Sequence, residues 1–175
     1  MMASLFDTGK EIQSGAFLSD CRDYRYTLWR RWDRYLPGCV FVGLNPSTAD
    51  ETEDDPTIRR CIGFAKSWGL GSLIMLNAYA FRATNPKDMT AARNPIGLLN
   101  DQAIEQTAQA QVDRGGIVVA AWGTHCDEQR EAAVCRVINR PIHCLGRTKA
   151  GRPKHPLYLR ADTMPELFWQ PQVEI

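Results

Sequence analysis

Two asparagines and a histidine stand where apolar stretches of the chain give way to polar residues. Asn45 ends the stretch FVGLN, Asn77 ends SLIMLN, and His155 closes the basic stretch GRTKAGRPKH. An amide side chain both donates and accepts hydrogen bonds, and an imidazole can donate one to an atom that becomes negatively charged. Side chains of these types could hold a polar ligand and stabilise an anionic leaving group.

The elements that would position these side chains follow from the hydropathy pattern. Short apolar runs alternate with stretches of helical spacing, which indicates parallel strands covered by helices on both faces. The runs predict four strands, at residues 39–44, 72–77, 117–122 and 142–145. The stretches between them predict helices that begin at Pro56 and that span residues 96–112 and about 125–138.

The two ends of the chain have weaker patterns. Residues 1–18 show little periodicity, whereas CRDYRYTLWRRWD alternates bulky and charged residues as a half-exposed strand does. A last short helix is expected around PELFW. We therefore predict a single domain over residues 1–175, with a three-layer α/β/α fold, a central four-stranded, mainly parallel sheet and an additional N-terminal strand or hairpin.

This arrangement would bring the polar side chains together. Ligands of open parallel sheets bind beyond the carboxyl ends of the strands. Asn45 and Asn77 would lie at that edge, with the turn WGTH (122–125) after the third run and His155 after the fourth. We expect these residues to share one ligand-binding rim.

An acidic run follows the first of these strands. In FVGLNPSTADETEDDPT five carboxylates fall within six residues, and Asp50, Asp54 and Asp55 are candidate ligands for Mg²⁺, a cation that prefers oxygen ligands. The alternative is structural, because an acid just before Pro56 would stabilise the positive end of a helix dipole. We favour the structural interpretation, since metal-dependent phosphate enzymes usually draw their ligands from several strands.

The composition is that of an ordinary globular protein. Hydrophobic residues make up 44% and charged residues 23% of the chain, and the net charge is +1, so the overall charge does not point to a polyanionic partner. The six cysteines include no C-x-x-C pair, which argues against a zinc ribbon. No apolar run reaches the roughly 20 residues of a membrane span, and no signal peptide is recognisable. We expect a monomeric cytoplasmic protein that has no membrane contact and uses no metal or cofactor.

The order of the motifs resembles two families. Over nearly all of residues 20–160 the chain is similar to an uncharacterised bacterial and phage family marked by LNPSTAD, then DDPT and an arginine pair. More remotely, VGLNPS, LIMLNA, VVAAWGTH and the basic loop ending KHPLYL resemble successive strand ends of the uracil-DNA glycosylase superfamily. That second resemblance implies a uracil-DNA glycosylase-like fold.

The glycosylase resemblance also implies an activity, the cleavage of the N-glycosidic bond of a flipped-out base, modified bases included. The implied partner is single- or double-stranded DNA, or a nucleotide. Asn45 would orient the attacking water and His155 would donate to the base oxygen, as the two catalytic residues. Asn77 would read the edge of the base, with Ser47 and Tyr79 as further base contacts.

Other observations leave alternatives open. The basic residues of the late loop would bind phosphates around the base: Arg147, Lys149, Arg152 and Lys154. However, the acidic run would repel DNA if it faced the same way, and Ser47 stands where the superfamily has tyrosine or glycine. A metal-dependent nucleotide hydrolase that uses residues 50–55, a glycosidase for free nucleotides, and a non-catalytic nucleic-acid or nucleotide binding module remain alternatives.

Overall fold

The structure is a computed structural model that describes residues 13–172. It contains seven strands: β1 (Gln13–Leu18), β2 (Arg25–Arg31), β3 (Gly38–Gly43), β4 (Ser72–Asn77), β5 (Ile117–Ala120), β6 (Ile142–Cys144) and β7 (Glu166–Trp169). The helices are α1 (Pro56–Ser67), α2 (Pro86–Ala91), α3 (Asn100–Val112), α4 (Glu128–Ile138) and the short 3₁₀ helix η1 (Pro156–Tyr158).

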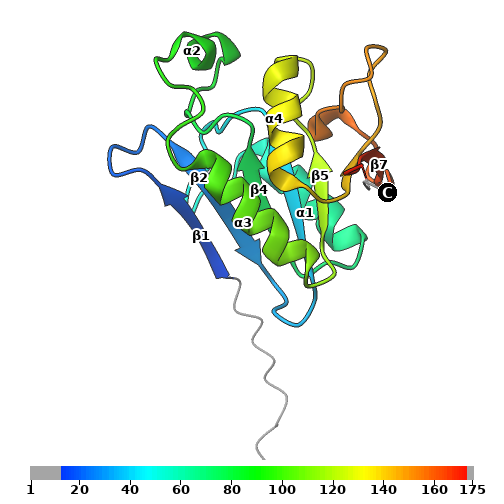
Figure 1. The fold of residues 1–175 in the computed structure, drawn as a ribbon. Coiled ribbons are helices and arrows are strands. Elements are labelled where there is room, and N and C mark those ends of the chain that lie inside the picture. Colours follow the sequence, from blue (N-terminus) through cyan, green and yellow to red (C-terminus); the bar gives the residue numbers. More distant parts are fainter. Residues whose placement is uncertain (1–12, 173–175) are drawn as a thin grey trace, which may run out of the picture.

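All seven strands form one mixed sheet in the order β1-β2-β4-β3-β5-β6-β7 (Figure 1). The central strands β4, β3, β5 and β6 pair in parallel. The pairs β1–β2, β2–β4 and β6–β7 are antiparallel. Because Gly43 pairs with Asn77, strands β3 and β4 end at the same level and deliver their following loops to one edge of the sheet.

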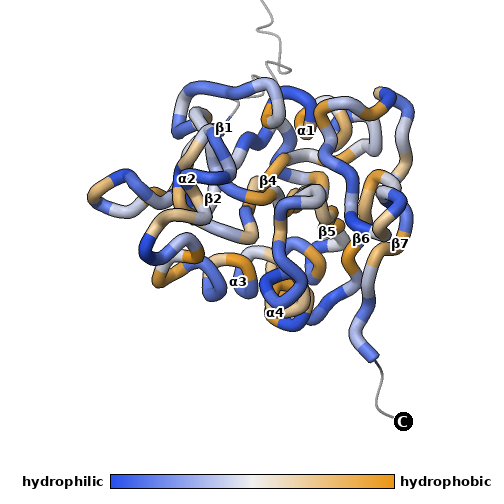
Figure 2. Tube along the Cα trace, turned by 90° about the horizontal axis from the view of Figure 1, so that it is seen from above, coloured by the Kyte–Doolittle hydropathy of each residue, from blue (hydrophilic) through white to orange (hydrophobic). Residues whose placement is uncertain are grey.

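The central strands are buried on both faces, as parallel strands between helices usually are. Cys39 and Phe41 of β3 pack with side chains of α1, whereas Val40 and Val42 pack on the opposite face with side chains of α3 and α4. Figure 1 shows α3 and α4 in front of the sheet and α1 behind it. Seen from above, apolar positions follow the central strands while polar positions follow the loops around them (Figure 2).

The α/β class is confirmed, but the expected four-stranded, mainly parallel sheet is wrong. The sheet has seven strands, and three of its six strand pairs are antiparallel. The stretch PELFW, expected to be helical, contains the edge strand β7, because its apolar residues pack beside β6. Residues 13–18, which showed little pattern, form β1, while residues 1–12 of the same segment lie outside the described part of the chain.

None of the helices within residues 13–172 has the length and apolar character needed to cross a membrane.

Candidate functional site

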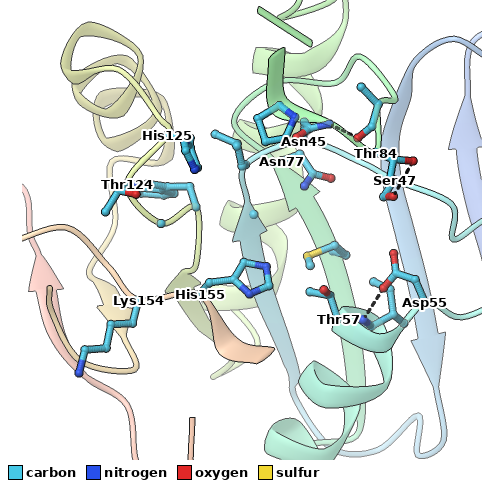
Figure 3. Close-up of a pocket in the computed structure, with 18 of the residues that line it drawn as sticks. Asn45, Ser47, Asp55, Thr57, Asn77, Thr84, Thr124, His125, Lys154 and His155 are labelled. Carbon is cyan, nitrogen blue, oxygen red and sulfur yellow. Dashed lines mark hydrogen bonds between the residues drawn. The ribbon is translucent and has the colours of Figure 1, made fainter. Parts of the chain in front are cut away.

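A cavity of about 580 Å³ opens at the carboxyl ends of β3, β4 and β5 (Figure 3). The loops that follow these strands supply much of its lining, and the segment around η1 and the start of α1 supply more. Asn45, Ser47, Asn77 and His155 all line it, as does Lys154. The structure therefore brings together both residues predicted to be catalytic and two of the three predicted to contact a base.

The amide of Asn45 is oriented by backbone carbonyls. Its Nδ2 donates to the carbonyl oxygens of Ala83 at 2.7 Å and Pro46 at 3.0 Å. Both carbonyls belong to loops that begin where β3 and β4 end, so the amide links those loops. Its Oδ1 has no partner among residues 13–172. Asn45 thus offers the site a hydrogen-bond acceptor, the group that a bound water needs.

The amide of Asn77 is oriented by a buried cation. Its Oδ1 accepts a hydrogen bond from Nη2 of Arg25 at 3.3 Å, and both side chains are 2% exposed. The Nδ2 group lies over Gly43, where an added Cβ atom would come within 2.8 Å of it. Since Arg25 can only donate, it fixes which end of the amide is oxygen. Asn77 therefore presents its NH₂ group to the space above Gly43.

The imidazole of His155 is a hydrogen-bond donor. Its Nδ1 accepts from the backbone N–H of Leu157 at 3.3 Å, which caps η1 and requires Nδ1 to be unprotonated. In the neutral ring the proton then sits on Nε2. Burial lowers the pKa of His155, while the nearby Asp55 carboxylate opposes that shift. The neutral form with a donor Nε2–H is thereby favoured.

The acidic run divides into separate contacts. Glu51 forms an exposed ion pair with Arg22 at 2.8 Å, and Asp54 pairs at 2.9 Å with Arg30, whose side chain is only 5% exposed. Asp50 accepts from the backbone N–H groups of residues 52 and 53. Among the described residues no group of three His, Cys, Asp or Glu side chains could hold a metal ion.

Asp55 has two roles in the architecture. Its Oδ1 accepts from the backbone N–H of Ile58 at 2.8 Å, so it is the N-cap of α1, at the helix start where the sequence interpretation placed an acid for its effect on the helix dipole. Asp55 also lines the cavity, alone among the three candidate acids. Asp50 and Asp54 do not line it.

Tyr79 and three of the four basic residues do not line the cavity either. The Tyr79 hydroxyl donates to Asp127 while the ring is buried. Arg147 donates to the carbonyls of Leu167 and Phe168 in β7, and Arg152 pairs with Glu131 at 2.7 Å. Both guanidinium groups thus hold the basic loop that follows β6 against β7 and α4. Lys149 is exposed outside the cavity lining, and Lys154 is exposed beside the cavity.

Arg25 is the site residue that the sequence analysis missed. It lies at the start of β2, in a stretch that was interpreted as half-exposed, yet it is buried and lines the cavity. Burial lowers the pKa of its guanidinium to about 10, and the Asp55 carboxylate opposes this shift. An alternating pattern of aromatic and charged residues gives no sign of which arginine turns inward, because both faces of such a strand look alike.

The fold and the cavity define a mixed α/β protein with a ligand-sized polar site at the carboxyl ends of its central strands. The chain belongs to the family described as "Protein of unknown function (DUF1643)", whose model matches residues 25–157. This match supports the first of the two resemblances and does not test the second, to the uracil-DNA glycosylase superfamily. No curated protein shows significant similarity to the chain.

Among solved structures, the chain is similar to a hetero-hexameric glutamate dehydrogenase from Thermus thermophilus in its Leu-bound form. The two are 14% identical, the match covers 73% of this chain and 30% of the other, and the TM-score is 0.33. So weak a likeness carries no argument about the fold or the function.

Proposed function

We propose that the protein is a DNA glycosylase-like hydrolase that cleaves the N-glycosidic bond of an extruded base. The observation that carries the proposal is the gathering of Asn45, Asn77 and His155 in one cavity, with their hydrogen-bonding directions set by neighbouring groups. The cavity volume, about 580 Å³, lies within the range of small-ligand pockets and is large enough for a base with its sugar.

The donors and acceptors match the charges of the reaction. Breaking the bond between C1′ and the base nitrogen leaves positive charge on the sugar and negative charge on the base. His155 Nε2–H would donate to a base oxygen where the negative charge develops. Asn77 Nδ2 would donate to a second acceptor on the edge of the base, and Asn45 Oδ1 would accept from the attacking water.

The acidic run is a weaker objection to a nucleic-acid partner than the sequence suggested. Two of its five carboxylates are paired with Arg22 and Arg30, and Asp50 caps a turn of its own loop. Their negative charges are therefore partly compensated. Phosphate contacts would fall to Lys149 and Lys154, so we expect a modest, salt-dependent affinity for DNA.

The alternatives gain less support. A metal-dependent nucleotide hydrolase would need Asp50, Asp54 and Asp55 to converge, but only Asp55 lines the cavity. A non-catalytic binding module on the same fold would differ from the glycosylase only in lacking turnover. The experiment described next distinguishes the two by whether a product forms.

A panel of oligonucleotides tests the proposal. Single- and double-stranded substrates carrying one uracil, hypoxanthine or 5-hydroxymethyluracil would be incubated with the protein in the presence of EDTA, and free base would be measured by mass spectrometry. We expect release of a free base and an abasic site, and loss of both in Asn77→Ala. Cleavage of phosphate esters that requires added Mg²⁺ would favour the metal hydrolase. Salt-sensitive binding without any product would leave the binding module.

A further inference from the structure

Asp55 is the one acidic residue among the cavity-lining residues of the described chain. It precedes α1, and it reaches the cavity from a different segment than His155 (Figure 3). Its Oδ1 is used by the N-cap hydrogen bond, but Oδ2 has no hydrogen-bond partner within residues 13–172. The carboxylate therefore has one oxygen committed to the helix and one available at the site.

Capping alone does not require a carboxylate. Asparagine and serine cap helices about as well as aspartate, because one side-chain oxygen is enough to accept from the exposed N–H groups. The cavity is also lined by the buried Arg25 cation, and the charge of Asp55 acts electrostatically on both Arg25 and His155. The charge of Asp55 thus lies within the polar network of the site.

The proposed hydrolysis needs a group of this kind. Asn45 can orient a water through Oδ1, but an amide cannot take up a proton. His155 cannot accept one in the required tautomer, since its Nδ1 is occupied by the Leu157 N–H and its Nε2 already carries a hydrogen. Among the lining residues that leaves two groups able to take up a proton, the Asp55 carboxylate and the imidazole of His125. Asp55 is held at the site by its hydrogen bond to α1, whereas no hydrogen bond within residues 13–172 holds the exposed His125 in place.

We propose that Asp55 is the general base that activates the water for attack on C1′. This inference rests on the proposed function. The water oxygen forms a bond to C1′ while the bond from C1′ to the base nitrogen breaks, and the electron pair of that bond leaves with the base. The proton lost by the water passes to Oδ2 of Asp55 and is later released to solvent, where the base anion is protonated. Oδ1 keeps its bond to α1 throughout.

Asp55→Asn separates this role from capping, because the amide oxygen still accepts from Ile58 and only the proton acceptor is lost. Glu51→Gln is the matched control: it makes the same chemical change in the same loop, but Glu51 lies outside the cavity lining. We expect Asp55→Asn to lower kcat for base release by about 100-fold or more, with KM changed by less than about threefold. Glu51→Gln should behave as wild type.

The outcomes are distinguishable, with the oligonucleotide panel described above as the substrates. If the wild type releases a base and Asp55→Asn releases it at a similar rate, the general-base role is overturned and the glycosylase proposal stands. If the wild type releases no base from any substrate, both proposals are overturned. Should Asp55→Asn fail to fold, Asp55→Ser, which retains a capping hydroxyl, would take its place, and a wild-type rate in that variant would equally overturn the role.

Discussion

The guanidinium of Arg25 holds the side-chain amide of Asn77 in one orientation. Nη2 of Arg25 donates to Oδ1 of Asn77 at 3.3 Å, and Nη1 donates to the carbonyl oxygen of Ala49 at 2.8 Å. One buried side chain from β2 thus connects the end of β4 with the loop after β3. The amide that faces the cavity is thus positioned by a buried side chain that also lines the cavity.

Replacement of Arg25 by methionine, which has similar length and no donor, should release the Asn77 amide. We expect the preference for one base over another to fall by roughly tenfold, because a free amide can present either its oxygen or its NH₂ group. The measurement is the ratio of kcat/KM for the best and the second-best substrate of the panel. Arg25→Lys, which keeps one charged donor, should retain more of that preference. An unchanged ratio in a folded Arg25→Met protein would show that Arg25 does not position the Asn77 amide.

The close approach of Gly43 to Asn77 can be tested in the same way. A Cβ atom at residue 43 would lie 2.8 Å from Nδ2 of Asn77, so Gly43→Ala should displace the amide and reduce base release by about tenfold. Gly63→Ala is the control, because nothing lies within 4 Å of its added Cβ. In the middle of α1 that change should raise the free energy of unfolding by about 0.5–1 kcal/mol and leave activity unchanged. Equal activities of the two variants would contradict the role given to Gly43.

The protonation of His155 should be visible by NMR. Burial lowers its pKa from the usual 6.5, so the ring should titrate below that value. The folded protein then binds this proton less readily than the unfolded chain. The stability contribution of His155 should therefore be complete above about pH 6.5 and decrease as the pH falls through the lowered pKa.

Asp55→Asn should lower the pKa of His155 further, because the carboxylate of Asp55 favours the charged imidazolium. Two-dimensional spectra of the imidazole nitrogens over a pH series would measure both values. A pKa that rises in Asp55→Asn, or a value above 6.5 in the wild type, would show that the ring is not placed as described.

The two ion pairs of the acidic run should differ in their effect on stability. Asp54→Ala leaves the guanidinium of Arg30, whose side chain is 5% exposed, without its carboxylate, and should lower the free energy of unfolding by about 2 kcal/mol. Glu51→Ala breaks an exposed pair and should cause little measurable change. Urea denaturation would measure the free energy of unfolding of both variants. Similar losses of stability in the two would contradict this prediction.

Much of the site was predictable because strand ends can be located from hydropathy alone. FVGLN and SLIMLN are apolar runs whose last residue is polar, and parallel pairing then places Asn45 and Asn77 at one edge. The start of a helix at Pro56 was equally local, since an acid followed by proline is typical of a helix start. The hydrogen bond from Ile58 that makes Asp55 its N-cap was not predicted. His155 was predicted to lie near them because it follows the fourth apolar run, and the carboxyl ends of parallel strands meet at one edge of the sheet.

What escaped prediction depends on contacts between distant segments. The buried guanidinium of Arg25 bonds to Ala49 and Asn77, which are distant in the sequence, and no local pattern specifies these contacts. Arg147 and Arg152 looked like free cations in a basic loop, yet their partners lie in β7 and α4. Strand β7 itself is short and lies at the sheet edge, where its pattern resembles that of a helix turn.

The most direct test of the account is the fate of the water oxygen. The wild-type protein would be incubated in heavy-oxygen water with the oligonucleotide that it processes fastest, and the products would be analysed by mass spectrometry. Hydrolysis of the N-glycosidic bond places the label on the abasic sugar and none on the phosphates or the released base. Label in a phosphate group, or no labelled product from any oligonucleotide of the panel, would contradict the proposed function.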